Sequence, residues 1–309
     1  MKIFDYFVEL HKPESNPAYL EALGKQNIIF LACSKSENHK NHRSTTSFKY
    51  TFQGKEFYHF NQRLLATDPG HYLLVNEGLE YESIIRSDDN VESFTIFFSP
   101  DFLRKALACH IQPEDKLLDN FNNPVNTENL YFFEKLYPVS QAMCLLLYKI
   151  RFEIKGKNTS LLALQEDMHQ LAFLLLEAHR QSIQESKNIS AVKLSTRIEL
   201  YKRVNHAKDY LLSCFKENID LASLAQTAQM AEFHFLRVFK DVFGITPHQF
   251  LTEVRLEQAQ NLLKSKYLPI SEIAFQSGFD NLSSFTRLFT KRIGVSPSRY
   301  KELQGLKVS

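Results

Sequence analysis

The sequence predicts an α+β protein in which a small N-terminal β-barrel with following helices precedes an all-α C-terminal domain. Three observations support this prediction: short alternating segments before residue 100, helical periodicity after it, and a duplicated helical unit near the end. The 309 residues suffice for two domains, and 44% hydrophobic with 23% charged residues is an ordinary globular composition. We expect one domain over residues 1–183, a linker over 184–194 and a second domain over 195–309.

The barrel is predicted over about residues 25–100. The apolar run Ile28–Cys33 is typical of a buried strand, whereas residues 34–46 are polar and predict a loop. From Phe48 to Phe98 the chain alternates as strands do, with Phe94, Ile96 and Phe98 on one side and Ser93, Thr95 and Phe97 on the other. Turns are expected at four places: Gly54, Asp68–Gly70, Glu77–Gly78 and Asp88–Asn90.

Helices are predicted over about residues 101–182, at Phe102–His110, Asn129–Glu153 and Leu161–Gln181. The last of these carries an apolar stripe at three- and four-residue steps, namely Leu161, Leu164, Met168, Leu171, Leu174 and Leu175. Such a stripe either pairs two chains or covers the open side of the barrel, and the sequence favours neither. Gln184–Lys193 lacks periodicity and is interpreted as a linker.

The C-terminal region contains a duplication. Its first copy is Phe235, Arg237, Phe239, Gly244, Pro247 and Phe250; adding 50 to each number gives Phe285, Arg287, Phe289, Gly294, Pro297 and Tyr300. The upstream halves correspond at an offset of 49, with Leu224-Ala225 matching Ile273-Ala274 and Met230 matching Phe279. Six matches at one offset, including a Gly and a Pro, indicate an internal repeat.

Each copy has the pattern of a helix-turn-helix, at about residues 221–240 and 270–291. A short helix with small apolar residues precedes a break in the period, where Gly278 can adopt the positive φ of a tight turn. A second helix then buries Phe235, Val238 and Phe239, or Phe285, Leu288 and Phe289. The outward groups of such a second helix are those that contact base edges in the major groove.

These residues resemble the C-terminal DNA-binding domain of the AraC/XylS family of bacterial transcription regulators. The resemblance rests on Ala225–Phe239, Gly244–Leu251, Arg255–Ala259, Ile270–Ala274, Gly278-Phe279, Phe285–Phe289 and Gly294–Tyr300, about a third of the chain. It implies a sequence-specific regulator that binds double-stranded promoter DNA and activates transcription through contact with RNA polymerase. Repression of transcription is the alternative. Neither catalytic residues nor a cofactor are expected.

The resemblance also implies the DNA-contacting residues. In the first recognition helix they are Phe233, His234, Leu236 and Arg237, with Lys240 near phosphates; in the second they are Leu282, Ser283, Ser284, Thr286 and Arg287, with Lys291 and Arg292 near phosphates. Leu236 departs from the polar residue common at its position, which suggests either contact with a thymine methyl group or weaker specificity in this half. The alternative for Arg237 and Arg287 is a solvated charge or a pair with a neighbouring acid.

A long helix joins the two copies. Pro247 suits the first turn of a helix because the donors of that turn have no intrahelical partner. The helix is predicted to run to about Lys264, which gives ~27 Å at 1.5 Å per residue. It can therefore hold two recognition helices about one DNA turn (~34 Å) apart, on one face of the duplex.

Charge and cysteine usage agree with an intracellular nucleic-acid binder. The net charge of +2 is uneven, because the last 119 residues carry a basic surplus and the first 190 an acidic one. The four cysteines are scattered without a C-x-x-C spacing, which favours a reducing compartment over a disulfide framework or zinc site. No signal peptide or membrane span is visible, so a cytoplasmic protein is expected.

The run Pro69–Gly78 resembles the cupin-type sensory domain that often precedes this DNA-binding domain. Metal-binding cupins use a His-x-His pair, which this sequence lacks, so no metal is expected. A small-molecule effector in the barrel would meet Tyr50, Phe57, Tyr58, His59 and Tyr81, and the alternative is that these aromatics fill the core. A homodimer is a further expectation. The competing functional class is a cupin-type metal-dependent enzyme fused to a DNA-targeting domain.

Overall fold

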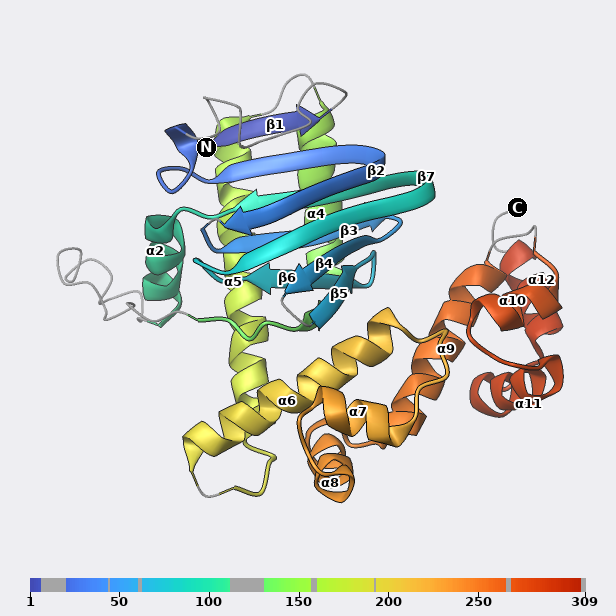
Figure 1. Cartoon of the computed structure of the whole chain (residues 1–309). Coiled ribbons are helices and arrows are strands. Elements are labelled where there is room, and N and C mark those ends of the chain that lie inside the picture. Colours follow the sequence, from blue (N-terminus) through green and yellow to red (C-terminus); the bar gives the residue numbers. More distant parts are fainter. Residues whose placement is uncertain are drawn as a thin grey trace. The chain divides into compact units, whose positions relative to one another are not determined.

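The computed structural model describes residues 1–6, 21–43, 45–60, 63–111, 131–156, 160–191, 193–264 and 268–306. The chain divides into two compact units, Met1–Lys187 and Asn188–Ser309, hereafter unit 1 and unit 2. Figure 1 shows a β-rich unit 1 and an all-helical unit 2, and each is described by itself. The predicted α+β fold class is confirmed.

Unit 1 is built on one strongly curved, nearly closed sheet of eight strands (Figure 1). Along the sheet the strands follow the order β1-β2-β7-β3-β6-β8, and β4 pairs with both β5 and β7. All pairings are antiparallel except β1 with β2. The strands are β1 (Lys2–Tyr6), β2 (Ile28–Arg43), β3 (Ser47–Gln53), β4 (Glu56–Phe60), β5 (Arg63–Thr67), β6 (His71–Val75), β7 (Glu80–Phe97) and β8 (Leu136–Pro138).

Two sequence predictions for the sheet were wrong, and one long strand pair explains both. Residues 34–43, predicted as loop, continue β2, which pairs along its length with β7. The expected turn at Asp88–Asn90 lies inside β7: Ser34 pairs with Val91 and Ser36 with Arg86, so residues 87–90 form a bulge. The predicted turns at Gly54 and Gly78 separate strands, and both glycines have positive φ, 79° and 82°.

Alternation along β7 separates the inner face of the barrel from the outer one. Ser93, Thr95 and Phe97 line an internal cavity of about 100 Å³, together with residues of β2, β3 and β4. Phe94 and Ile96 are fully buried on the opposite face, where the Phe94 ring lies 5.6 Å from that of Phe52. The two-sided pattern predicted from the sequence is therefore present, and both faces of this strand are buried.

Helices cover the outer face of the barrel. They are α2 (Pro100–Ile111), α4 (Gln141–Lys155) and α5 (Leu161–Ser186). On α4, Tyr148 packs edge-on against Phe52 of β3 at 5.3 Å, and Arg151 donates two hydrogen bonds to the Glu92 carboxylate of β7. The helix predicted at Asn129–Glu153 begins only at residue 141, because β8 and the N-cap residue Ser140 precede it.

Most of the apolar stripe of α5 is packed within unit 1, although Leu161 at its start is 59% exposed. Leu164, Met168, Leu171 and Leu175 are completely buried in the single chain, which leaves them no surface for a second chain. These four side chains are therefore not available to pair two chains, and coverage of the open side of the barrel remains a prediction. The helix also runs to Ser186, three residues into the predicted linker.

Unit 2 consists of seven helices among its described residues. They are α6 (Leu194–Ser213), α7 (Leu221–Thr227), α8 (Glu232–Phe243), α9 (Pro247–Leu263), α10 (Ile270–Gln276), α11 (Leu282–Ile293) and α12 (Pro297–Leu306). The pairs α7–α8 and α10–α11 are the two predicted helix-turn-helix units, and α9 connects them.

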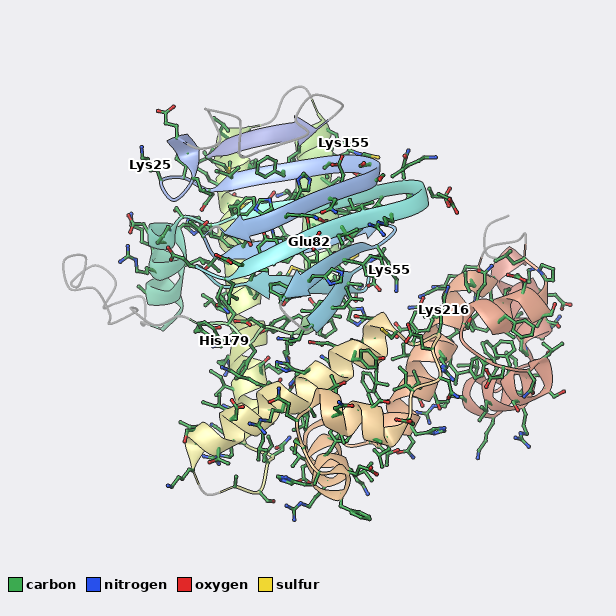
Figure 2. The ribbon with its side chains drawn as sticks, viewed as in Figure 1. Lys25, Lys55, Glu82, Lys155, His179 and Lys216 are labelled. Carbon is green, nitrogen blue, oxygen red and sulfur yellow. The ribbon has the colours of Figure 1, made fainter. Side chains whose placement is uncertain are left out.

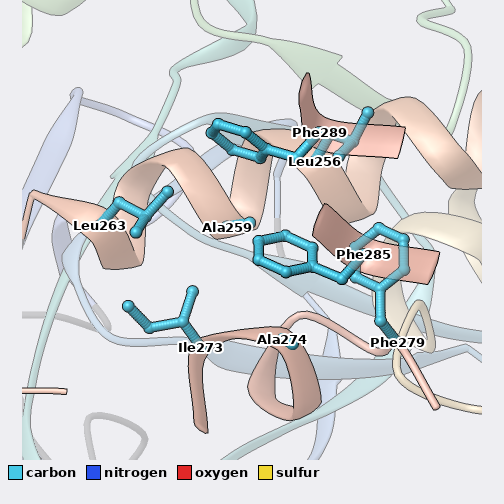
Figure 3. Packing of buried hydrophobic residues seen from close by; sticks show 8 residues of the cluster. All are labelled: Leu256, Ala259, Leu263, Ile273, Ala274, Phe279, Phe285 and Phe289. Carbon is cyan, nitrogen blue, oxygen red and sulfur yellow. The ribbon is translucent and has the colours of Figure 1, made fainter. Parts of the chain in front are cut away.

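The second helix-turn-helix has its own hydrophobic core (Figure 3). Leu256, Ala259 and Leu263 of α9 face α10 and α11 across this core. Ala259 and Ala274 are fully buried, and their small side chains allow close helix approach. The cluster is completed by Ile273, Phe279, Phe285 and Phe289.

Candidate nucleic-acid interface

The turns of the two helix-turn-helix units have the same hydrogen bonds. Met230 N donates to Ala225 O at 2.9 Å, and its counterpart Phe279 N donates to Ala274 O at 3.0 Å. The residue before each donor is left-handed: Gln229 has φ 52° and Gly278 has φ 84°. Both turns thus have the same left-handed backbone conformation, although only the second turn has a glycine, the residue that suits this conformation.

The ends of the recognition helices α8 and α11 are also alike. Each stops at a left-handed glycine, Gly244 or Gly294, whose N–H donates to the carbonyl four residues earlier. The next helices begin at Thr246 and Ser296, whose hydroxyls accept hydrogen bonds from backbone N–H groups three residues on. These caps fix where both recognition helices end.

Equivalent aromatic pairs anchor the inward faces of these helices. Phe239 meets Phe250 at 5.9 Å and 82°, and Phe289 meets Tyr300 at 5.5 Å and 79°. Edge-to-face geometry at these distances is favourable for aromatic rings. With the inward face of each helix fixed in this way, the opposite face is directed outward.

The outward face of α8 carries most of the residues predicted to contact DNA. Phe233 is 90% exposed, and His234, Arg237 and Lys240 are exposed as well. Leu236 is half-buried beside them. The structure therefore places all five predicted residues on the accessible side or the edge of one helix.

The outward face of α11 forms one wall of a shallow groove. The groove is lined by Leu282, Ser283, Thr286, Arg287, Thr290 and Lys291. Of the seven predicted residues in this helix, Ser284 and Arg292 lie outside the lining, and the N–H of the half-buried Ser284 is occupied in capping the helix through Asn281. Thr290 was missed, although it lies 50 residues after Lys240 and the repeat could have indicated it.

The two equivalent arginines are available for a ligand. Within the described part of the chain neither Arg237 nor Arg287 forms an ion pair or hydrogen bond, and the same holds for Lys240 and Lys291. Exposed guanidinium groups can donate two parallel hydrogen bonds to guanine O6 and N7. Arg292 differs from the expectation, because its guanidinium lies 2.6 Å from the Glu253 carboxylate of α9.

Arg255 connects the first half of unit 2 to the second half, a contact that the sequence did not indicate. Arg255 of α9 donates from Nε to Phe215 O and from Nη2 to Glu217 O, both at 2.8 Å. A Cβ on Gly278 would lie 2.7 Å from the same Phe215 oxygen. The segment after α6, the connecting helix and the second turn therefore meet at one point.

The barrel cavity of unit 1 receives two of the candidate ligand-binding residues. Tyr58 and Tyr81 line it, with ring centroids 5.9 Å apart. Tyr50 lies on the outer face, where its hydroxyl donates to Pro69 O, and neither Phe57 nor the exposed His59 is part of the lining. The cavity contains instead residues that aromatic patterning did not indicate, chiefly Lys49 and Glu56.

A domain model described as "Helix-turn-helix domain" matches residues 224–303. The protein named "Probable transcription factor PqrA" of Proteus vulgaris is 31% identical over 86 residues, which are 28% of this chain and 70% of that protein. The chain belongs to the AraC/XylS family of transcriptional regulators.

Other matches cover different shares of the chain. "Probable transcriptional regulator LumQ" of Photobacterium leiognathi is 28% identical over 240 residues, 72% of this chain and 90% of LumQ. An HTH-type regulator of Haemophilus influenzae is 30% identical over 132 residues, and the match spans only 42% of that protein. The DNA-binding domain of AdpA, solved with target DNA, is 28% identical with a TM-score of 0.33, over 34% of this chain and 95% of AdpA's.

No group of three or more His, Cys, Asp or Glu side chains in the described part of the chain is arranged to hold a metal ion. Among the described helices none is long and apolar enough to cross a membrane. The relatives named above are described as regulators or transcription factors, and DNA binding is the activity that the helix-turn-helix domain supports.

Proposed function

We propose that this AraC-family regulator contacts two adjacent major-groove segments with α8 and α11. The observation that carries the proposal is the equivalence of Arg237 and Arg287. Both lie at the same position of the repeated motif, on the outward face of the second helix, and neither is engaged by another described residue. If each arginine formed an ion pair with a carboxylate of the protein, that would have argued against base contact.

Each outward residue has a role that follows from its chemistry. Arg237 and Arg287 each donate to a guanine, which gives ~1–3 kcal/mol of discrimination per contact. His234, Ser283 and Thr286 offer shorter polar contacts, and Leu236, Phe233 and Leu282 meet thymine methyl groups. Lys240 and Lys291 lie near phosphates, where they contribute affinity and salt dependence instead of sequence preference.

The connecting helix makes both contacts possible from a single chain. With its 17 residues α9 is ~26 Å long at 1.5 Å per residue. Successive major-groove segments on one face of the duplex lie ~34 Å apart. A helix of this length, with one helix-turn-helix unit before it and one after it in the chain, suits that separation.

We further propose that the protein is an effector-responsive activator in the cytoplasm. Its relatives include the "Lactose operon transcription activator" of Staphylococcus xylosus and the "RCS-specific HTH-type transcriptional activator RclR" of Escherichia coli. Unit 1 would serve as the sensor, with the effector in the barrel cavity, and unit 2 would present the recognition helices beside RNA polymerase.

We also propose that unit 1 forms a homodimer through α4. Leu145, Tyr148 and Phe152 lie at three- and four-residue steps on this helix and are 67%, 45% and 80% exposed. Leu161 and Leu162 at the start of α5 are also largely exposed. A second copy of the same surface would remove this apolar stripe from water.

Selection of bound sequences from a random DNA pool by the full-length protein tests the proposed DNA contacts. We expect two enriched blocks about one helical turn, or ~10 base pairs, apart. Enrichment of one block only, or salt-sensitive binding without sequence preference, would contradict the proposed pair of base-contacting helices.

A further inference from the structure

Lys49 is a buried lysine without a conventional partner. Its side chain extends from β3 into the barrel cavity and the residue is 3% exposed. Among the described residues no oxygen lies within hydrogen-bonding distance of Nζ and no carboxylate within 4.0 Å. Two aromatic faces lie beside it, with Nζ 4.2 Å from the centroid of Phe97 and 5.1 Å from that of Tyr81.

Two further polar groups of the cavity are equally unsatisfied. Glu56 Oε2 and the Tyr58 hydroxyl, both from β4, are buried and form no well-aligned hydrogen bond with a described residue, although the two side chains lie close enough to interact and Ser83 and Ser93 lie beside the Glu56 carboxyl. Buried polar groups in proteins are nearly always hydrogen-bonded, and leaving one unpaired is costly. Three such groups around one cavity indicate that it is built for a polar occupant.

The volume and the walls of the cavity limit that occupant. A volume of about 100 Å³ exceeds that of a single water site and suits a ligand of roughly five to ten heavy atoms. Phe30, Ile85 and Phe97 supply apolar walls beside the polar groups. The ligand is therefore small, with a polar end and an apolar body.

The protonation of the polar groups favours an anionic end. Burial lowers the pKa of Lys49 to about 7, and the nearby Glu56 acts in the opposite direction. Burial raises the pKa of Glu56, which favours its protonated form, a hydrogen-bond donor. Lys49, the Tyr58 hydroxyl and a protonated Glu56 together present donors to one small space, and a carboxylate is an acceptor-only group that matches them.

We propose that the barrel cavity binds a small organic carboxylate, whose oxygens accept hydrogen bonds from Lys49, Tyr58 and Glu56. This inference names the ligand class for the effector response proposed above and rests on that proposal only for its regulatory meaning. A carboxylate would also give the buried ammonium the charged partner that the protein itself does not supply.

The remaining titratable groups of the cavity lie on β2 and β7. Glu37 and His39 of β2 are 3.5 Å apart and partly exposed, at 29% and 21%. His42 stacks on Tyr81 at 5.4 Å, and burial, with the charges of Lys49 and His39, lowers the pKa of His42 to about 3. A neutral His42 leaves Lys49 as the buried cation beside the ligand.

Calorimetric titration of the full chain tests this inference. The probes are the carboxylates from acetate to hexanoate and benzoate, each paired with its neutral primary amide. We expect at least one carboxylate to bind and its amide to bind at least about tenfold more weakly, because an amide forfeits a charge-assisted hydrogen bond. Affinity should also fall by up to about tenfold per pH unit above pH 7, as Lys49 must be protonated to bind.

Three variants identify the groups responsible. Lys49→Met should weaken carboxylate binding by at least about tenfold, and Tyr58→Phe, which removes a single hydroxyl, by several-fold. Lys55→Met is the control: Lys55 (labelled in Figure 2) is close in sequence but lies outside the cavity lining. Sequence-specific DNA binding without carboxylate should be unchanged in all three, since the substitutions lie in unit 1.

Binding of no carboxylate, equal binding of the amides, or retained affinity in Lys49→Met and Tyr58→Phe would overturn the inference. DNA selection by the same preparations would then still show whether the proposed DNA contacts stand. Failure of the carboxylate site is thus distinguishable from failure of the regulator's DNA-binding function.

Discussion

At the scale of single residues, the repeated turn shows how one conformation constrains two different amino acids. Gln229 and Gly278 occupy equivalent left-handed positions, with φ of 52° and 84°. A non-glycine residue is strained there by about 1 kcal/mol or more. The carbonyl of Gln229 accepts a hydrogen bond from Arg203 at 3.0 Å, which helps to hold the strained turn.

We predict that Gln229→Gly raises the free energy of unfolding of unit 2 by about 0.5–1 kcal/mol, because it relieves the left-handed strain at some cost in chain entropy. Urea denaturation followed by hydrogen exchange of α7 and α8 amides would measure it. A lower free energy of unfolding would show that the Gln229 side chain stabilises unit 2 by more than the left-handed backbone strain destabilises it.

We predict that Gly278→Ala destabilises unit 2 by more than Gly294→Ala does. Both glycines have positive φ, but an added Cβ at Gly278 meets Phe215 O at 2.7 Å, whereas at Gly294 it meets nothing within 4 Å. The difference between the two variants therefore isolates the close contact from the backbone effect, which alone costs about 1–2 kcal/mol. Equal losses in thermal denaturation would contradict the contact.

The sequence predicted the inward and outward faces of α8 and α11 well, because the apolar residues that recur at helical spacing in both copies are the ones that are buried. Phe235, Phe239, Phe285 and Phe289 are fully buried, so the residues between them are directed outward. In the barrel the same reasoning was incomplete. Tyr50 and Tyr58 are both buried aromatics, yet they lie on opposite faces of the sheet, and the pattern gave no sign of which face encloses the cavity.

At the scale of secondary-structure elements, α9 does more than separate the two motifs. Through Arg255 it holds the backbone after α6, and through Leu256, Ala259 and Leu263 it forms the core of the second motif. The relative placement of α8 and α11 therefore depends on contacts along this helix. That dependence matters for DNA segments of fixed spacing.

We predict that Arg255→Lys weakens binding to DNA carrying both blocks by about tenfold and leaves binding to either block alone nearly unchanged. Lysine keeps the charge but lacks the forked donors that reach Phe215 O and Glu217 O together. Fluorescence anisotropy with the two kinds of duplex would measure it. Arg299→Lys, at an exposed pair with Glu302, is the matched control.

The errors in predicted elements have a common physical origin. The half of β2 after residue 34 is polar because Glu37, His39 and His42 line a polar cavity while Asn38 and Lys40 are exposed. Apolar alternation, the usual strand signal, is therefore missing. The turn-forming residues Asp88–Asn90 do interrupt the regular strand. Because β2 and β7 pair on both sides of them, they form a bulge within β7 instead of a turn between two strands.

At the scale of the whole molecule, the exposed face of α4 predicts self-association. Phe152→Glu should weaken the proposed dimer at least about tenfold, because a charge would be buried in an apolar interface. Sedimentation equilibrium across a concentration series would measure it, with Leu194→Glu of α6, where the leucine is 52% exposed, as a control. A wild-type protein that remains monomeric throughout would refute the dimer.

The division of the chain into two units predicts a division of effects. Substitutions in the barrel cavity should alter ligand binding, and those on α8 and α11 should alter DNA binding. Figure 2 shows the side chains of unit 1 and labels His179 of α5. The ring of His179 packs against those of Phe132 and Phe133, with centroids 5.2 and 5.6 Å away.

The central claim is that two equivalent arginines contact two different DNA segments. Its most direct test is a binding matrix of wild type, Arg237→Ala and Arg287→Ala against the selected site and single-base substitutions in each block. We predict that each variant loses ~1–3 kcal/mol on the selected site and becomes insensitive to substitutions at one guanine, while remaining sensitive in the other block. If both variants instead weaken binding to every duplex equally, the arginines contact phosphates alone and the two-segment account is wrong.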